Sequence, residues 1–173
     1  VNDVSDYQKG ADGPDRVGPV RLAASGLATP RAIWVAAACC FALATACGAW
    51  LAWHRGWPIV AIGVASILAA IGYTSGPWPL AYKGLGEVTV ALFFGPVAVL
   101  GTEYVLAGSP SVWGAWLSLV PAGMGAAVLA INNLRDREGD ARAGKRTLAV
   151  RIGGERAARM IRFLLLIAYM API

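Results

Sequence analysis

The sequence predicts an all-α protein, a polytopic bundle of transmembrane helices. Three observations predict this fold class: the composition, the length of the apolar runs, and the placement of Lys and Arg. Of the 173 residues, 57% are hydrophobic and 14% are charged. Soluble domains are usually about 45–50% apolar and about 25% charged. A chain of this composition is expected to lie mostly in a lipid bilayer.

Four apolar runs approach or exceed the roughly 20 residues that a helix needs to cross a membrane. They cover residues 32–53, 58–75, 86–107 and 112–131, and a fifth begins near residue 162 and continues to residue 173. Short turns join them, which argues against buried helices of a large soluble protein. We therefore expect one transmembrane domain over residues 1–173. It is expected to be a fragment with four full spans and a truncated fifth, taken from inside a longer protein.

The basic residues indicate how these spans are oriented. Fourteen of the 15 Lys and Arg lie in residues 1–31, 76–85 and 132–162, whereas the other two connections hold only Arg55. Cytoplasmic loops of membrane proteins carry an excess of Lys and Arg. We expect the basic segments to face the cytoplasm and the protein to lie in the bacterial inner membrane. This placement explains the net charge of +5, so no nucleic-acid partner is expected.

Small residues are abundant in the apolar runs, for example over residues 123–127. They let transmembrane helices approach closely where lipid provides no hydrophobic drive for association. We expect them to pack helix against helix. The three cysteines lie within residues 39–47 and are expected to be buried apolar residues rather than disulfide partners or metal ligands.

Two clusters of Asn and Asp follow, or would follow, apolar runs on the predicted cytoplasmic side. In the first, Asn2 and Asp6 are four residues apart, so they share one face of a helix. Asp3 is close enough to share that face, whereas Asp12 comes after Gly10, where the helix is expected to break. Taken alone, such a cluster has an ordinary explanation, a solvated helix end with capping side chains.

The second cluster repeats the spacing. Asn132, Asp136 and Asp140 are each four residues apart, so a carboxamide and two carboxylates share one helix face. Carboxylates crowded together repel one another unless cations neutralise them. Oxygen ligands without His or Cys suit Mg²⁺, which takes one or two carboxylates and is completed by substrate phosphate. Two such clusters on one side of the membrane predict two Mg²⁺ ions that together bind a diphosphate.

These motifs resemble one family. Asn2-Asp3-x-x-Asp6-x-x-x-Gly10-x-Asp12 and Asp136-x-x-x-Asp140 resemble the two Asp-rich signatures of the UbiA-type intramembrane prenyltransferases. Other segments resemble the 1,4-dihydroxy-2-naphthoate polyprenyltransferase branch, which acts in menaquinone synthesis: residues 18–21, 25–27, 73–87, 93–95, 101–102, 132–136 and 143–151. The resemblance covers essentially the whole chain. It departs from the general superfamily pattern where a carboxylate would stand at Gly10. Asp12 stands two residues later instead, a spacing that the naphthoate branch tolerates.

The resemblance implies both a fold and a reaction. The fold would be a helical bundle, with nine spans when complete, around a cavity that opens sideways to lipid. The reaction would transfer a polyprenyl group from polyprenyl diphosphate to 1,4-dihydroxy-2-naphthoate, with loss of CO₂ and diphosphate, to give demethylmenaquinone. Mg²⁺ would neutralise the departing diphosphate, and a water-poor cavity would protect the allylic cation from hydrolysis. The expected partners are these two substrates and the lipid bilayer.

Particular residues are expected to carry this chemistry. The expected Mg²⁺ ligands are Asn2, Asp6, Asp12, Asp136 and Asp140, with Asp3 and Asn132 as second choices. The expected catalytic residues are Asp6, Asp136, Asp140 and Tyr73, of which Tyr73 would contact the leaving group or the aromatic acceptor. The expected substrate-binding residues are Asn2, Lys83, Asn132, Arg135 and Arg146.

Several of these residues have a second explanation. The basic residues around the second cluster are either phosphate ligands or positive-inside anchors: Arg135, Arg137, Arg142, Lys145 and Arg146. Tyr73 and Tyr82 also fit an interfacial aromatic belt. A carboxylate within a span is a functional hypothesis by default, which draws attention to Glu87. Glu103 is expected near the outer interface, and His54, on the outer side, is not expected to be catalytic.

Three other functions compete with this interpretation. Another member of the superfamily would prenylate 4-hydroxybenzoate, haem or a sugar phosphate. A cation-coupled transporter would place polar groups in the middle of its spans, whereas here they cluster at the ends. A non-catalytic membrane scaffold would not need Asp6 or Asp136 for prenyl transfer.

Overall fold

In the computed structural model, residues 1–10 and 19–171 are described, and every regular element among them is a helix. The predicted all-α class is therefore confirmed. The elements in chain order are α1 (Asn2–Gln8), α2 (Pro30–Arg55), α3 (Trp57–Gly72), a 3₁₀ helix η1 (Leu80–Lys83), α4 (Gly86–Leu92), a π-helix η2 (Phe93–Val97), α5 (Ala98–Ala107), α6 (Val112–Leu117), α7 (Leu119–Arg135), α8 (Arg137–Arg142), α9 (Leu148–Ile152) and α10 (Gly154–Met170).

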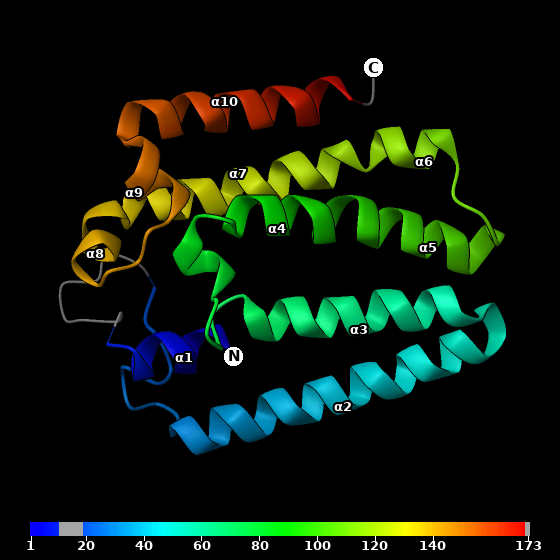
Figure 1. The fold of residues 1–173 in the computed structure, drawn as a ribbon, viewed down its shortest axis with the longest axis horizontal. Helices are drawn as coiled ribbons and strands as arrows, with labels where there is room; N and C mark the ends of the chain where they lie inside the picture. The colour runs from blue at the N-terminus through cyan, green and yellow to red at the C-terminus, as the bar shows by residue number, and fades with distance from the viewer. Residues whose placement is uncertain (11–18, 172–173) are drawn as a thin grey trace.

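The long helices lie side by side in one row, with neighbours running in opposite directions (Figure 1). The order along the row is α2, α3, the α4–η2–α5 stretch, the α6–α7 stretch and α10. The short helices α1, α8 and α9 all lie at one end of the row. That end, which also holds the 73–85 loop, is called the polar end here. The α2–α3 turn and the α5–α6 connection lie at the opposite, far end.

Within the described part of the chain, three helical stretches are long and apolar enough to cross a membrane: Pro30–Arg55, Gly86–Ala107 and Val112–Arg135. The helix Trp57–Gly72 is apolar but shorter, at 16 residues, or about 24 Å. It ends three residues before the predicted limit of residue 75. The turn that follows contains Pro77 and Pro79, whose preceding residues are driven out of helical backbone. That this helix also spans the bilayer stays a prediction.

The last helix begins earlier than the apolar run indicated. α10 starts at Gly154, whereas the run was expected from residue 162. Its first two turns carry Glu155, Arg156 and Arg159, so a search for apolar length passed over them. They are nevertheless helical, and Ala157 and Ile161 are buried on the same helix. Helical periodicity, with the apolar residues on one face, was the signal that would have found this start.

Small residues bring α7 close to its two neighbours, as predicted. A Cβ built on Gly95 of η2 would lie 2.5 Å from the Ala122 Cβ and 2.9 Å from the Ser118 carbonyl oxygen. One built on Gly123 would lie 2.7 Å from the Leu164 carbonyl oxygen of α10. The π-helical turn contains Pro96, a residue that cannot donate the regular helical hydrogen bond.

The cysteines differ from their prediction. All three are free and exposed, because no residue of α2 is buried within the part of the chain described. Burial of these cysteines was therefore wrong for this structure. Their apolar surroundings on α2 are consistent with a helix whose surface faces lipid.

Hydrogen bonds hold the far end together. Arg55 donates to the Leu106 carbonyl oxygen at 3.0 Å, and the Tyr104 hydroxyl donates to the Arg55 carbonyl oxygen at 2.9 Å. The Ser111 backbone N–H donates to Glu103 Oε2 at 2.9 Å, just before α6 begins. His54 also lies at this end, with its ring Nδ1 2.9 Å from the Trp50 carbonyl oxygen. The two bonds of Arg55 join the end of α2 to the end of α5, far from the polar end.

Candidate functional site

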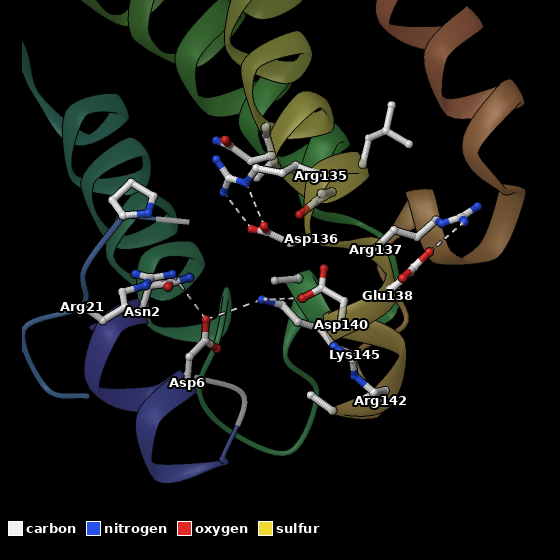
Figure 2. Close-up of a pocket in the computed structure, with 18 of the residues that line it drawn as sticks. Asn2, Asp6, Arg21, Arg135, Asp136, Arg137, Glu138, Asp140, Arg142 and Lys145 are labelled. Atoms are coloured by element: carbon white, nitrogen blue, oxygen red, sulfur yellow. Dashed lines mark hydrogen bonds and ion pairs between the residues drawn. The ribbon is translucent and has the colours of Figure 1, made fainter. Parts of the chain in front are cut away.

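An open cavity of about 680 Å³ lies at the polar end. The two Asn/Asp clusters meet there, although they come from opposite parts of the chain. Its lining includes Asn2 and Asp6 from α1, and Asn132, Asp136 and Asp140 from the end of α7 and from α8. Figure 2 shows Asp6 on one wall facing Asp140 on the other, with Lys145 between them. The same cavity is lined by five cations: Arg21, Arg135, Arg137, Arg142 and Lys145.

Asp6 is a buried carboxylate, and both of its oxygens have partners in the site. The Tyr82 hydroxyl donates to Asp6 Oδ1 at 2.9 Å. The other oxygen, Oδ2, lies 3.4 Å from Lys145 Nζ and 3.8 Å from an Arg21 guanidinium nitrogen. The carboxylate is thus held in one orientation by a phenol and two cations.

The second cluster occupies the break between α7 and α8. α7 ends at Arg135, whose guanidinium donates twice to Asp136, at 2.7 and 2.8 Å. Asp140 follows on α8, with Oδ1 3.8 Å from Lys145 Nζ. Burial raises the pKa of the Asp140 carboxyl above its ordinary range. The Lys145 ammonium opposes this rise, whereas the carboxylates of Asp136 and Asp6 add to it. Removal of this carboxyl from water therefore outweighs the nearby cation in its effect on the pKa of Asp140.

Asp3 faces away from this chemistry. Its Oδ1 accepts from the Ala23 backbone N–H at 3.0 Å, and its Oδ2 accepts from the Leu22 backbone N–H at 3.1 Å. Asp3 therefore anchors the segment that follows α1, and it does not line the cavity. Asp12, the other expected carboxylate of the first cluster, lies outside the described residues.

The oxygen atoms present fit a hard divalent cation. Asn2 Oδ1 and Asp140 Oδ2 are both buried, and neither has a hydrogen-bond partner. Buried polar atoms without partners are uncommon and require an explanation, such as an ion. Within the described residues, no three His, Cys, Asp or Glu side chains form a ready-made metal cage. Mg²⁺ does not require one, since it commonly binds one or two carboxylates and takes its other ligands from phosphate and water.

The structure brings most of the other expected residues into this site, but not all. Tyr73, Asn132 and Arg135 line the cavity. Lys83 and Arg146 are outside the lining. The Lys83 ammonium lies 4.9 Å from the centroid of the Trp78 ring. These two residues stay predicted substrate contacts, without support from their position here.

Three residues of the site were not given a role from the sequence. In the sequence, Tyr82 fits an interfacial aromatic belt, and Lys145 is either a phosphate ligand or a positive-inside anchor. Arg21 is there only part of the motif at residues 18–21. All three contact Asp6. The signal available was weak: Lys145 follows a Gly within the second motif region, and nothing in the local pattern connects it with α1.

A buried pair supports the inner wall of the cavity. Glu87 of α4 is 4% exposed, and its Oε1 accepts from Asn133 Nδ2 at 2.9 Å. Asn133 lines the cavity beside Asn132. The carboxylate that sequence analysis singled out within a span therefore ties α4 to α7 directly behind the second cluster.

Comparison with known proteins agrees with this geometry. The profile of the UbiA prenyltransferase family matches residues 1–173. The chain is 45% identical over 168 residues to a protein of Mycobacterium tuberculosis named 1,4-dihydroxy-2-naphthoate octaprenyltransferase, covering 97% of this chain and 57% of that protein. Proteins of the same name from Escherichia coli and Bacillus subtilis are 40% and 26% identical, over 92% and 98% of this chain and 54% of each relative.

The chain spans about half the length of these curated relatives. No solved structure matches it. The family profile covers every residue of the chain, including both Asn/Asp clusters that line the cavity. The apolar helices make it a membrane protein, and the chain belongs to the UbiA prenyltransferase family.

Proposed function

We propose that the whole protein transfers a polyprenyl group from polyprenyl diphosphate to 1,4-dihydroxy-2-naphthoate. CO₂ and diphosphate leave, and the prenylated hydroquinone, demethylmenaquinol, forms; a separate two-electron oxidation then gives demethylmenaquinone. One observation carries the proposal: two Asn/Asp clusters from opposite parts of the chain face each other across one cavity at the helix ends. The names of the relatives, at 45% and 40% identity, support the choice of acceptor.

UbiA-type prenyltransferases generally depend on a divalent metal, and we propose Mg²⁺. Asn2, Asp6, Asp136 and Asp140 would hold it, and Asp12 is proposed as a further ligand from the sequence motif alone. When bound, Mg²⁺ would neutralise the negative charge that builds on the diphosphate as the allylic C–O bond breaks.

The cations of the cavity bind the diphosphate in this proposal. Arg21, Arg135 and Lys145 line the wall and pair with its carboxylates. Their donors reach phosphate oxygens that replace part of those pairings. The first event is then rupture of the bond between the allylic carbon and the diphosphate oxygen, with the electron pair leaving on the diphosphate.

The inner wall of the cavity serves the second half of the reaction. Leu129 and Ala81 line it together with Tyr73, and apolar side chains keep water from the allylic cation. The naphthoate ring carbon that bears the carboxyl group forms the new C–C bond. The carboxylate then leaves as CO₂, and the electron pair of the broken C–C bond returns to the ring. We propose that Tyr73 contacts the ring or the leaving diphosphate and holds the two reactants in register.

We also propose that this end of the bundle faces the cytoplasm of a bacterial inner membrane. The connections at the polar end carry the Lys and Arg, and the far end carries Arg55. A prenyl tail is apolar and remains beside the helices in lipid, whereas its diphosphate reaches the charged cavity. The active site is thereby placed where both a lipid-soluble and a water-soluble substrate can enter.

An acceptor assay on the full-length protein tests the proposal. Purified enzyme in detergent micelles receives farnesyl diphosphate, Mg²⁺ and either 1,4-dihydroxy-2-naphthoate or 4-hydroxybenzoate, and products are identified by mass spectrometry. We expect prenylated, decarboxylated naphthoquinol, no reaction with 4-hydroxybenzoate, and loss of turnover with a chelator. Product from 4-hydroxybenzoate and none from 1,4-dihydroxy-2-naphthoate would show that the protein acts in another branch of the superfamily. Metal-independent cation transport without release of diphosphate would support a transporter instead.

A further inference from the structure

Lys145 occupies an unusual place between the two Asn/Asp clusters. Its ammonium lies 3.4 Å from Asp6 Oδ2 on α1 and 3.8 Å from Asp140 Oδ1 on α8. Its side chain is only 13% exposed, so solvent screens these pairings little. It is the cation that the described structure shows paired with carboxylates of both clusters. It therefore lies between the same carboxylates that the metal is proposed to use.

The backbone keeps Lys145 in that place. Gly144 has φ +71°, the left-handed region, and follows the end of α8. The Lys145 N–H donates to the Asp140 carbonyl oxygen at 2.8 Å, and the Gly144 N–H donates to the Ala141 carbonyl oxygen at 3.2 Å. This pair of bonds is a Schellman motif, which ends a helix with a fixed turn. The turn directs the Lys145 side chain toward the carboxylate of Asp140, the same residue whose carbonyl oxygen accepts from the Lys145 N–H.

Tyr82 fixes the other side of the ammonium. The Lys145 Nζ lies 5.3 Å from the centroid of the Tyr82 ring, and the Tyr82 hydroxyl donates to the same Asp6 carboxylate. The Arg146 backbone N–H donates to the Tyr82 carbonyl oxygen at 3.2 Å, which joins the two loops. A cation over an aromatic face is stabilised further when water is largely excluded. Lys145 is thus a cation that its neighbours hold in one place, rather than an exposed residue that acts as a positive-inside anchor.

We propose that Lys145 competes with the divalent ion for Asp6 and Asp140, and that the diphosphate relieves the competition by accepting the Lys145 ammonium. A metal ion arriving alone must displace an ammonium that then lacks a partner in a poorly screened site. A diphosphate provides oxygen atoms to which the ammonium can donate. Metal and diphosphate binding are therefore coupled through this one side chain. The inference rests on the proposed function, because it takes the metal and the diphosphate as the ligands of this cavity.

The competition has a signature that a simple phosphate ligand would not give. Removing the ammonium takes one competing cation away from both carboxylates, while Arg21 and Tyr82 remain on Asp6, so the metal alone binds more tightly. The same change removes a donor to phosphate, so diphosphate binds more weakly. The two affinities move in opposite directions. A structural anchor, by contrast, would leave the affinity for metal alone unchanged.

Binding measurements on the full-length protein test this. Free Mn²⁺ is measured by electron paramagnetic resonance, with Mn²⁺ as the probe for the divalent site and inorganic pyrophosphate as the probe for the diphosphate. For Lys145→Met we expect Mn²⁺ alone to bind about tenfold more tightly than to the unaltered protein, and pyrophosphate in saturating Mn²⁺ to bind about tenfold more weakly. Lys145→Arg, which keeps the cation, should stay within about threefold of the unaltered protein for both ligands.

Arg142→Met is the matched control. Arg142 lines the same cavity, but the described structure shows no ion pair between it and Asp6 or Asp140. Because it is exposed, its loss should change the affinity for Mn²⁺ alone by less than about threefold. Lys145→Gln is a second neutral variant in case Lys145→Met does not fold, as judged by gel filtration.

Unchanged or weaker binding of Mn²⁺ alone to both neutral variants would overturn the proposal. An equal gain from Arg142→Met would also overturn it, since it would show a general charge effect. Prenyl transfer is a separate readout. If the opposite shifts occur but no acceptor is prenylated, the proposed function fails while the competition stands.

Discussion

At the scale of single residues, Asp3 and Asp6 show how the same side chain serves two purposes within four positions. Both oxygens of each carboxylate have a partner, but those of Asp3 accept from backbone N–H groups of the described chain, whereas Asp6 accepts from the side chains of the cavity. The sequence left open whether Asp3 or Asp12 assists Asp6. Asp3 is committed to the chain that follows α1, which leaves Asp12, outside the described residues, as the partner to test.

Asp6→Asn should abolish most of the activity. The carboxamide keeps the shape and the bond from Tyr82 but removes the charge that attracts Lys145, Arg21 and the proposed metal. We expect kcat/KM for prenyl transfer to fall by on the order of 100-fold or more, measured with saturating naphthoate. A fall of less than about threefold would remove Asp6 from the list of ligands.

Asp3→Asn should act on stability instead. One amide oxygen replaces two carboxylate oxygens, so one of the N–H groups of Leu22 and Ala23 loses its charged partner. We expect a loss of about 1–2 kcal/mol in the free energy of unfolding, followed by denaturation in mixed micelles. The Mg²⁺ concentration for half-maximal activity should stay the same. A large increase in that concentration would identify Asp3 as a metal ligand after all.

At the scale of elements, the ends of the helices determine where the site residues lie, and glycine residues form some of these ends. Gly144 ends α8 in the left-handed region, and Gly108 ends α5 in the same way at the far end, with φ +83°. A residue with a Cβ is strained by about 1–2 kcal/mol in this conformation. The same local chemistry therefore has different consequences at the two ends, because only Gly144 determines the position of Lys145.

Gly144→Ala and Gly108→Ala form a matched pair for this reason. Both should lower the stability by a similar amount, measured as the midpoint of thermal unfolding in detergent. Only Gly144→Ala should also raise KM for the prenyl diphosphate, by up to about tenfold if the strain is relieved by moving Lys145. Equal KM values for the two variants would show that the turn does not position the cation.

The packing of η2 on α7 gives a sharper prediction about stability. The Cβ of Gly95→Ala would meet both the Ala122 side chain and the Ser118 backbone, and backbone cannot rotate away. We expect a loss of about 1–3 kcal/mol in the free energy of unfolding in mixed micelles. Gly63→Ala is the control, since a Cβ at Gly63 in α3 meets nothing within 4 Å. Equal stability of the two variants would contradict the close approach of η2 and α7.

At the scale of the whole molecule, some features could be predicted from the sequence and others could not. Hydropathy predicted the long helices because lipid imposes a length on each apolar run. The spacing of Asn132, Asp136 and Asp140 predicted a shared face because that relation is local. The Asp6–Lys145 pairing joins residues 139 apart, and no local period reports such a contact. It follows only from the arrangement that makes α1 and α8 face each other across the cavity.

The orientation of the bundle is the remaining prediction at this scale. The polar end should face the cytoplasm because its connections carry the excess of Lys and Arg. Single cysteines at exposed Ser25, near the polar end, and at exposed Ser109, in the α5–α6 connection, report on the two ends. They are introduced into full-length protein whose native cysteines are replaced, since Cys39, Cys40 and Cys47 are exposed on α2.

A membrane-impermeant maleimide applied to intact spheroplasts should label Ser109→Cys, and it should label Ser25→Cys only after lysis. The reverse pattern would put the cavity on the outer face of the membrane and would contradict the proposed orientation. Prenyl transfer by each cysteine variant is measured on the same membranes, so that labelling is interpreted only for folded, active protein. The two positions lie in connections at opposite ends of one row of helices. The orientation of the cavity therefore follows from which of the two cysteines is labelled before lysis.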